Sequence, residues 1–405
     1  MPIVGMVGGG QLARMTAAAA VGLGATFRVL AGSPGESAAL VTHDVAVGSH
    51  LSLPDLSKFA DECDVITFDH EHVPAGHLEA LEAAGVLVRP GPAALRYTQD
   101  KLEMRRRLAA LGAPVPRFAP VSSAAEVAEF AAAGTLRHPQ QPQDPHQSQS
   151  SADGWPVVLK AISGGYDGKG VWVCASQAEA ASVVESAASH GISLMAEEFV
   201  PFRRELAAQV ARSASGQGAA YPVVQTVQVD GICREVIAPA PGLPADLAID
   251  AQGLALRIAS ALDVVGLLAV ELFETSRGLL VNELAMRPHN SGHWSIDGAC
   301  TSQFEQHLRA VLDLPLGSPS GLVPSGFVVM ANLLGGTDPD IYDRYIHVMA
   351  ADPGVKVHFY GKEVRPGRKI GHVTVVGGPF DSVESLRDRA RRAASYLRWG
   401  TEDGD

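Results

Sequence analysis

Short apolar runs alternate with alanine-rich, helix-length stretches through the first hundred residues of the chain. The runs that predict strands are 3–7, 26–30, 65–68 and 86–88. Strands that alternate with helices normally form a parallel sheet with helices on both faces. This region is therefore predicted to be a doubly wound parallel sheet, and the glycine and two prolines in 111–116 predict a domain boundary behind it.

From residue 157 onward the pattern becomes rich in strands. Strands are predicted at 157–160, 171–173, 194–199, 206–212, 223–229, 267–274 and 279–283, with helices at 178–188 and 247–262. This order predicts an α+β organisation. Before it, residues 138–152 contain three prolines and almost nothing that a core could bury, which predicts a disordered surface insertion.

The charge balance and the cysteines exclude several classes of protein. Lys and Arg number 32 against 44 Asp and Glu, a net charge of −12, so the overall field would repel nucleic acids and anionic membranes. The four cysteines lie far apart without C-x-x-C spacing, which argues against a zinc ribbon and a disulfide framework. No uncharged apolar run reaches the roughly 18 residues of a membrane span, and the N-terminus lacks the basic start of a signal peptide. A cytoplasmic protein is predicted.

A glycine-rich turn, 8–10, follows the first predicted strand and opens a helix. With Ala13 it fits the G-x-G-x-x-G/A pattern of dinucleotide-binding proteins. In those proteins the second strand ends in an acidic residue that binds the ribose, whereas residues 28–33 end in small neutral groups. Binding of NAD is therefore the least favoured interpretation. A structural tight turn and a helix N-terminus that faces phosphate or substrate both stay open.

A second glycine-rich segment, 163–170, lies between two predicted strands. Four glycines in eight residues let backbone N–H groups approach phosphate oxygens, and Lys160 at the end of its strand is placed to reach the same phosphates. A plain glycine-rich hairpin is the alternative.

Two glutamates, Glu271 and Glu283, lie among apolar residues on successive predicted strands. Buried carboxylates are unfavourable unless something pairs with them, and two of them repel each other unless a cation lies between them. Carboxylate oxygens with Asn282 beside them suit Mg²⁺ that also contacts nucleotide phosphates. Salt bridges to arginines are the alternative.

Polar and basic residues are concentrated in two further segments. Residues 287–294 combine an arginine, two histidines, an asparagine and a serine directly after a predicted buried strand, which indicates a site. Residues 361–372 hold four cations in an acidic protein, which predicts either a solvated charge run or a clamp for an anion.

These motifs together resemble the ATP-grasp fold, through Lys160, the loop 164–168, the pair Glu197-Glu198, and Glu271 with Asn282-Glu283. Over nearly its whole length the chain is similar to the N5-carboxyaminoimidazole ribonucleotide synthetases, from 8–12 through 289–294 to 363–372. The last two motifs distinguish this family from other ATP-grasp ligases. The chain departs from the family pattern at Met286, where members have proline, and at Asp69, where they have glutamate.

The resemblance implies a fold, an activity and a division into domains. The activity would be the carboxylation of 5-aminoimidazole ribonucleotide by ATP and bicarbonate, through carboxyphosphate, in purine biosynthesis. ATP and Mg²⁺, with two ions expected, would be the cofactors, and the protein would be a homodimer. The predicted domains are an N-terminal doubly wound domain (1–113), a lid (114–204), a catalytic ATP-grasp domain (205–320) and a small β-rich C-terminal domain (321–400).

The resemblance also implies roles for individual residues. Orientation of bicarbonate and the intermediate would fall to Arg287, His289 and Asn290, and Mg²⁺ would be bound by Glu271 and Glu283. The implied ATP contacts are Lys101, Lys160, Gly165, Tyr166, Asp167, Gly168, Glu197, Glu198, Val200, Glu205 and Asn282. The implied ribonucleotide contacts are Gly10, Gln11, Glu71, Tyr166, Lys362 and Arg368.

Three other functions compete with this one. The first is another ATP-grasp carboxylase or ligase, and the second is an NAD-dependent oxidoreductase, against which the missing ribose-binding acid counts. The third is a nucleotide-binding module without catalysis, which would be expected to lack one of the two metal-binding glutamates, whereas both are present.

Deleting residues 139–151 is expected to leave the catalytic rate within a few-fold of the full chain. The segment has no apolar side chains to contribute to a core, and a change in loop length costs only about 0.6 kcal/mol per doubling. Solubility and specific activity of the shortened protein test this. An insoluble or inactive product would mean that the segment is ordered and needed.

Overall fold

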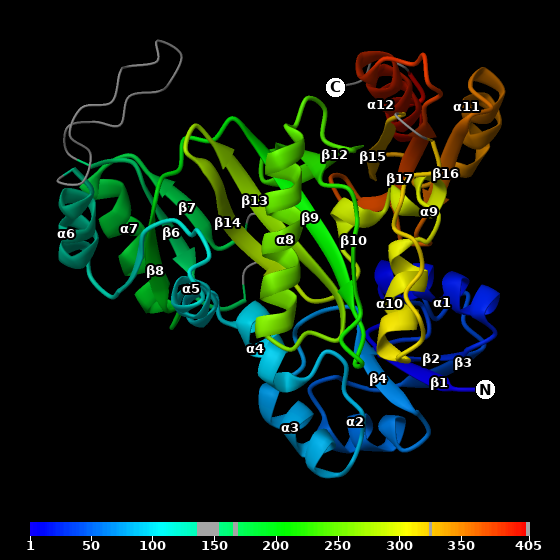
Figure 1. Ribbon diagram of the computed structural model, residues 1–405, viewed down its shortest axis with the longest axis horizontal. Coiled ribbons are helices and arrows are strands. Elements are labelled where there is room, and N and C mark those ends of the chain that lie inside the picture. Colours follow the sequence, from blue (N-terminus) through cyan, green and yellow to red (C-terminus); the bar gives the residue numbers. More distant parts are fainter. Residues whose placement is uncertain (136–153, 165–168, 324–325, 402–405) are drawn as a thin grey trace.

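The computed structural model describes residues 1–135, 154–164, 169–323 and 326–401, and the insertion expected at 138–152 lies outside them. Within the described residues the strands form three sheets, two of four strands and one of nine. Figure 1 shows the N-terminal sheet in blue, a small sheet at the left and the large sheet between that small sheet and the C-terminal helices. We call them the N-terminal sheet (β1–β4), the lid sheet (β5–β8) and the central sheet (β9–β17).

The N-terminal sheet is parallel, in the order β3-β2-β1-β4, and helices cover both of its faces, so the predicted doubly wound sheet is confirmed. Its elements are β1 (Ile3–Val7), α1 (Gln11–Leu23), β2 (Thr26–Ala31), β3 (Asp44–Val47), α2 (Leu53–Ala60), β4 (Val65–Phe68), α3 (Ala75–Ala83), α4 (Pro92–Gln99) and α5 (Lys101–Ala110). The strand expected at 86–88 is wrong, because only an isolated bridge joins Val88 to Ile66. The chain bends at Arg89 and Pro90 directly after this bridge, so no ladder follows.

Helix α5 sets up part of the site through its first turn. The side chain of Asp100 accepts a hydrogen bond from the backbone N–H of Glu103 at 2.8 Å, and the helix begins at the next residue. Lys101 and Arg105 are four residues apart and therefore lie on one face of the helix. Both side chains are buried, whereas Arg106 is exposed.

The lid sheet is antiparallel, in the order β5-β8-β6-β7. Its elements are β5 (Phe118–Val121), α6 (Ala124–Thr135), β6 (Val157–Ala161), β7 (Val171–Cys174), α7 (Gln177–Ser189) and β8 (Leu194–Glu198). Its buried side chains form a hydrophobic cluster of their own, which includes Val127, Leu159 and Ala196. The lid sheet is thus built around a core separate from that of the rest of the protein.

The central sheet runs in the order β14-β13-β9-β11-β12-β15-β17-β16, with β10 paired to β9. The strands of its first part, with the helices that lie between and after them along the chain, are β9 (Arg204–Arg212), β10 (Gly218–Ala220), β11 (Val224–Val229), β12 (Ile232–Ala238), α8 (Ala245–Ala261), β13 (Gly266–Thr275), β14 (Gly278–Ala285), η1 (Asn290–Gly292), α9 (Ser295–Gly298) and α10 (Gln303–Val311). The strands of its second part, again with the helices that lie between and after them, are β15 (Val328–Leu334), η2 (Tyr342–Arg344), α11 (Tyr345–Ala351), β16 (Val355–Phe359), β17 (Lys369–Val376) and α12 (Val383–Trp399). One sheet therefore crosses the boundary expected at residue 320, and the domain limits stay predictions.

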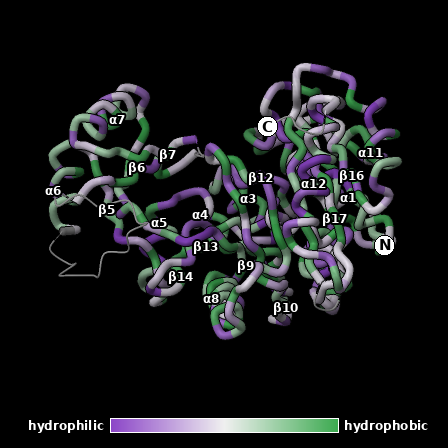
Figure 2. The backbone as a smooth tube through the Cα atoms, turned by 90° about the horizontal axis from the view of Figure 1, so that it is seen from above, coloured by the Kyte–Doolittle hydropathy of each residue, from purple (hydrophilic) through white to green (hydrophobic). Residues whose placement is uncertain are grey.

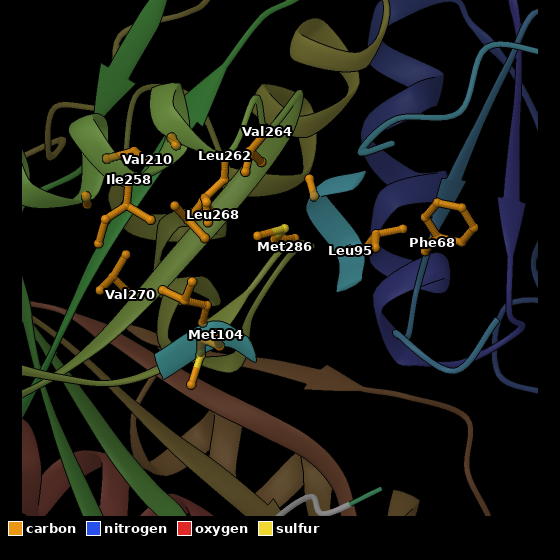
Figure 3. Close-up of a cluster of buried hydrophobic side chains, with 14 of the residues drawn as sticks. Phe68, Leu95, Met104, Val210, Ile258, Leu262, Val264, Leu268, Val270 and Met286 are labelled. Atoms are coloured by element: carbon orange, nitrogen blue, oxygen red, sulfur yellow. The ribbon is translucent and has the colours of Figure 1, made fainter. Parts of the chain in front are cut away.

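The largest hydrophobic cluster joins the N-terminal region to the central sheet. Figure 3 shows part of it, from Phe68 on β4 through Leu95 on α4 to Met286 and Leu268. Helix α10 adds a second link, because it packs against α1 on one side and β13 on the other. Seen from above in Figure 2, the lid sheet lies at one end of the molecule and α11 and α12 lie at the other. Among helices in the described ranges, none is long and apolar enough to cross a membrane.

Candidate active site

A cleft of about 870 Å³ is bordered by the lid sheet, the central sheet and the N-terminal region. It brings together most of the residues predicted for the site: Glu71, Lys101, Lys160, Glu197, Glu198, Val200, Glu205, Glu271, Asn282, Glu283, Arg287, His289 and Asn290. Four further predicted residues, Gly165, Tyr166, Asp167 and Gly168, lie outside the described part of the chain. Residues from four predicted motifs, far apart in the sequence, thus line one cavity.

A buried ion network lies on the lid side of the cleft. The Glu197 carboxylate accepts from Arg105 Nε at 2.5 Å and pairs with Lys160 Nζ at 2.7 Å. Lys160 also donates to Asn282 Oδ1 at 3.1 Å, and Arg105 donates to the backbone oxygen of Asn282 at 2.6 Å. Burial favours the neutral acid, but the two cations hold the pKa of Glu197 below its ordinary value. Burial likewise lowers the pKa of Lys160, and Glu197 opposes that effect.

Arg105 was not among the predicted site residues, although it lines the cleft and is fully buried. Its sequence neighbours Arg106 and Arg107 carry the same charge, so composition does not single it out. Arg105 is distinguished only by its position on the helix, which places it on the same inward face as Lys101.

An apolar wall continues the cleft beyond this network. The rings of Phe202 and Phe273 stack with centroids 4.7 Å apart, and both line the cavity beside buried Val200. Glu198 and Glu205 lie next to them, and burial raises the pKa of Glu205 to about 6. An apolar slot with carboxylates at its edge suits a purine ring with hydrogen-bond donors on its rim.

Glu271 and Glu283 lie directly opposite each other on β13 and β14. Burial, followed by the charges of Glu283 and Glu205, raises the pKa of Glu271 to about 7. Lys101 forms a salt bridge with Glu283, and His289 Nε2 lies 3.4 Å from Glu271 Oε1. Among the described residues no arginine bridges either carboxylate, so the arginine salt-bridge alternative does not hold there.

The loop after β14 holds a neutral imidazole at the cleft. His289 Nδ1 accepts from Ser291 Oγ at 2.9 Å and from the Ser291 backbone N–H at 3.4 Å, so the ring proton lies on Nε2 and faces Glu271. Burial, together with the charges of Arg287 and Lys369, lowers the pKa of His289 to about 3. Both side-chain polar atoms of Asn290 are buried without a hydrogen-bond partner in the described residues. This loop therefore offers uncommitted polar atoms beside Arg287, whose Nε donates to Glu71 at 2.8 Å.

The predicted contacts for the ribonucleotide lie at the junction of the C-terminal region and the glycine turn. Lys362 donates to Gln11 Oε1, which joins the basic run to the turn. Arg368 is exposed and donates to the backbone oxygen of Glu363 at 3.3 Å. These residues and Gly10 do not line the cleft described above, and their roles stay predictions. From the same run, Lys369 does line the cleft, although it was not among the predicted site residues.

Two carboxylates fill the glycine turn at the start of α1. A Cβ on Gly10 would clash with Asp69 Oδ2, and one on Gly9 would clash with Glu36 Oε2. Gly9 N–H donates to Glu36 at 3.1 Å, and Ala13 N–H lies 3.4 Å from Asp69 Oδ2. The positive end of the helix thus faces carboxylates of the chain itself, which argues against a dinucleotide pyrophosphate at this position.

Comparison with known proteins agrees with this geometry. Residues 1–99 match the ribonucleotide synthetase preATP-grasp domain, residues 106–304 the ATP-grasp domain, and residues 328–388 the phosphoribosylaminoimidazole carboxylase C-terminal domain. The N5-carboxyaminoimidazole ribonucleotide synthase of Mycobacterium bovis is 53% identical over 403 residues, covering 98% of this chain and 88% of that protein. The chain belongs to this family.

Solved structures of the N5-carboxyaminoimidazole ribonucleotide synthase family share the fold. The synthetase from Thermus thermophilus is 37% identical with a TM-score of 0.81, covering 98% of both chains. The synthase from Aspergillus clavatus, in complex with ADP and 5-aminoimidazole ribonucleotide, is 30% identical with a TM-score of 0.83, again covering 98% of both. Met286, one of the two departures from the family pattern, is fully buried in the largest hydrophobic cluster. That departure therefore alters the core and not the surface of the cleft.

Asp69 predicts a pH-dependent stability. Burial raises its pKa from 3.8 to about 6, so between these pH values the folded protein keeps a proton that the unfolded chain has lost. The free energy of unfolding therefore falls as pH rises through this window, by about 3 kcal/mol in total. Asp69→Asn removes the charge at similar size and is expected to raise the thermal unfolding midpoint at pH 7.5 but hardly at pH 4.

Thermal unfolding of the wild type, Asp69→Asn and the exposed control Asp61→Asn at both pH values tests this. An equal difference between Asp69→Asn and wild type at pH 4 and pH 7.5 would contradict the shifted pKa.

Proposed function

We propose that this protein is an N5-carboxyaminoimidazole ribonucleotide synthase, which uses ATP and bicarbonate to carboxylate the amine of 5-aminoimidazole ribonucleotide and releases ADP and phosphate. The observation that carries the proposal is the composition of one cleft. It combines buried cations beside an apolar slot, two opposed carboxylates, and a loop with Arg287, a neutral His289 and an unsatisfied Asn290. A family relative has been solved with ADP and the ribonucleotide.

The donor set supports Mg²⁺ as part of this proposal. Glu271 and Glu283 are opposed, and burial disfavours the ionised form of Glu271. The described residues contain no group of three or more His, Cys, Asp or Glu side chains that would hold a metal by themselves. Mg²⁺ is typically bound by one or two carboxylates together with substrate phosphates, so a site completed by the nucleotide fits. When bound, the ion supplies neutralisation of phosphate charge. Two ions, as expected from the resemblance, remain part of the proposal.

The proposed chemistry needs charge neutralisation and positioning. A bicarbonate oxygen attacks the γ-phosphorus of ATP, the bond to ADP breaks, and carboxyphosphate forms. The amine of the ribonucleotide then bonds to the carboxyl carbon, either directly with loss of phosphate or after carboxyphosphate has split into CO₂ and phosphate, and gives up a proton. Lys160 and Arg105 place positive charge beside the apolar slot, where ATP phosphates would lie.

Arg287 and Asn290 are proposed to orient the carbonate species. An arginine offers a planar set of N–H donors that suits an oxyanion, and both polar atoms of the buried Asn290 amide lack a hydrogen-bond partner in the described residues. His289 is uncharged with its proton on Nε2, so it donates a hydrogen bond at the cleft without adding a charge. A homodimer in the cytoplasm, with no nucleic-acid partner, completes the proposal.

Release of ADP should require Mg²⁺ and bicarbonate and should be strongly stimulated by 5-aminoimidazole ribonucleotide, because closure over a filled site precedes phosphoryl transfer. A coupled ADP assay with each component omitted in turn measures this. Equal stimulation by glycinamide ribonucleotide would instead favour another ATP-grasp ligase.

Arg368→Ala should raise KM for the ribonucleotide by about ten- to a hundred-fold, with little change in KM for ATP. Each charge-assisted bond to a phosphate dianion contributes roughly 1.5 to 3 kcal/mol, and the ATP phosphates are assigned to other residues. Arg365→Ala is the control, because Arg365 is an exposed neighbour in the same run and is bound to Glu363 at 2.9 Å. The phosphate-clamp assignment fails if both KM values move together, or if neither moves.

A further inference from the structure

The side chain of Gln303 holds the backbone of His289 from behind the cleft. Gln303 is the first residue of α10 and is fully buried. Its Oε1 accepts from the His289 backbone N–H at 2.9 Å, and its Nε2 donates to the His289 backbone oxygen at 2.9 Å. One carboxamide thus satisfies both backbone polar groups of one residue, as a neighbouring strand would in a sheet.

Two further bonds fix the orientation of this carboxamide. Gln303 Oε1 also accepts from Gln209 Nε2 at 2.7 Å, and Gln303 Nε2 also donates to His293 Nδ1 at 2.8 Å. All four hydrogen-bonding positions of the amide are therefore used. A flipped amide would turn its two N–H groups toward the N–H groups of His289 and Gln209, so the arrangement has one orientation. Burial lowers the pKa of His293, so its ring is neutral, and Nδ1 accepts because it faces the Gln303 amide N–H.

The backbone of Gln303 continues the network into the same loop. Its N–H donates to Ser295 Oγ at 2.8 Å, and that hydroxyl donates to the backbone oxygen of Gly292 at 2.6 Å. Residues 289 and 292, at the two ends of the loop segment that contains Asn290, are therefore both fixed to the start of α10. Gln303 does not line the cleft, so any effect on the reaction acts through His289 and Asn290.

We infer that Gln303 is a positioning residue for the proposed carboxylation. It sets the depth and the direction at which the His289–Asn290 segment meets bicarbonate and carboxyphosphate, and this inference rests on the function proposed above. Since the binding residues for ATP lie on other elements, loss of this support is expected to change turnover and coupling more than ATP binding.

Helix α10 contains a matched control one turn later. Gln306 is also fully buried, and its carboxamide holds Gly317 in the same way, with Nε2 donating to the Gly317 oxygen and Oε1 accepting from the Gly317 N–H, each at 2.7 Å. Gly317 is not among the residues that line the cleft. Gln303→Met and Gln306→Met therefore remove the same chemistry from the same helix, once behind the loop and once elsewhere.

The experiment compares these two full-length variants with wild type by thermal unfolding, by kcat and KM for each substrate, and by the ratio of ADP released to carboxylated product. Both variants are expected to unfold at lower temperature. Only Gln303→Met should lower kcat, by about ten-fold or more, and raise the ratio of ADP to product, with KM for ATP within about two-fold of wild type. Gln303→Glu keeps the acceptor for the His289 N–H but loses both donated bonds. Its kcat should therefore lie between that of wild type and that of Gln303→Met.

The inference is overturned if Gln303→Met keeps wild-type kcat and coupling, or if Gln306→Met loses as much activity at the same loss of stability. If Gln303→Met does not fold, the same criteria apply to Gln303→Glu. Wild-type protein without ribonucleotide-dependent ADP release would overturn the proposed function itself, and this inference with it. Active wild type with a normal Gln303 variant would overturn this inference alone.

Discussion

The buried carboxylate of Glu197 is the interaction on which the arrangement of the cleft depends. It lies on β8 of the lid sheet and binds both Arg105 of α5 and Lys160 of β6, and these two cations also contact Asn282 on β14 of the central sheet. Loss of one member of a buried ion network leaves an uncompensated charge, which is unfavourable by about 3 to 5 kcal/mol. Because the lid sheet has its own hydrophobic cluster, this polar network, and not a shared apolar core, joins it to the central sheet beside the cleft.

Charge is separated along the cleft in a way that the net charge of −12 does not reveal. The cations of the Glu197 network lie beside the apolar slot, while Glu271 and Glu283 lie opposed further along. A nucleotide polyphosphate placed there would meet cations on one side and carboxylates on the other. The carboxylates and the phosphates repel each other unless a cation lies between them, so this order of charges favours a metal–nucleotide complex over the free nucleotide.

The parts of the protein that could be predicted from sequence are those with a local cause. Three strands of the N-terminal sheet follow from their apolar runs, whereas β3 was not predicted. Strands β6, β13 and β14 carry residues that meet at the cleft. Strand β17 was not predicted, because it begins at Lys369 inside a basic run and buries His372 and Thr374. Arg105 and Gln303 were missed for a related reason. Their role depends on which helix face is turned inward and on which distant backbone it meets, and neither is a property of neighbouring residues.

The glycine turn at the start of α1 shows why a motif needs its surroundings before it can be assigned a function. The same spacing would suit a pyrophosphate, but here Asp69 and Glu36 occupy the space that the absent side chains leave free. A phosphate brought to this turn would meet two carboxylates, whereas a ligand group with N–H or O–H donors would find acceptors. Lys362, bound to Gln11 at the edge of the turn, adds a positive charge near Asp69. The turn therefore suits ligand groups with N–H or O–H donors better than the diphosphate of a dinucleotide, and the proposal places hydroxyl and amine groups of the ribonucleotide here, with its phosphate toward the basic run.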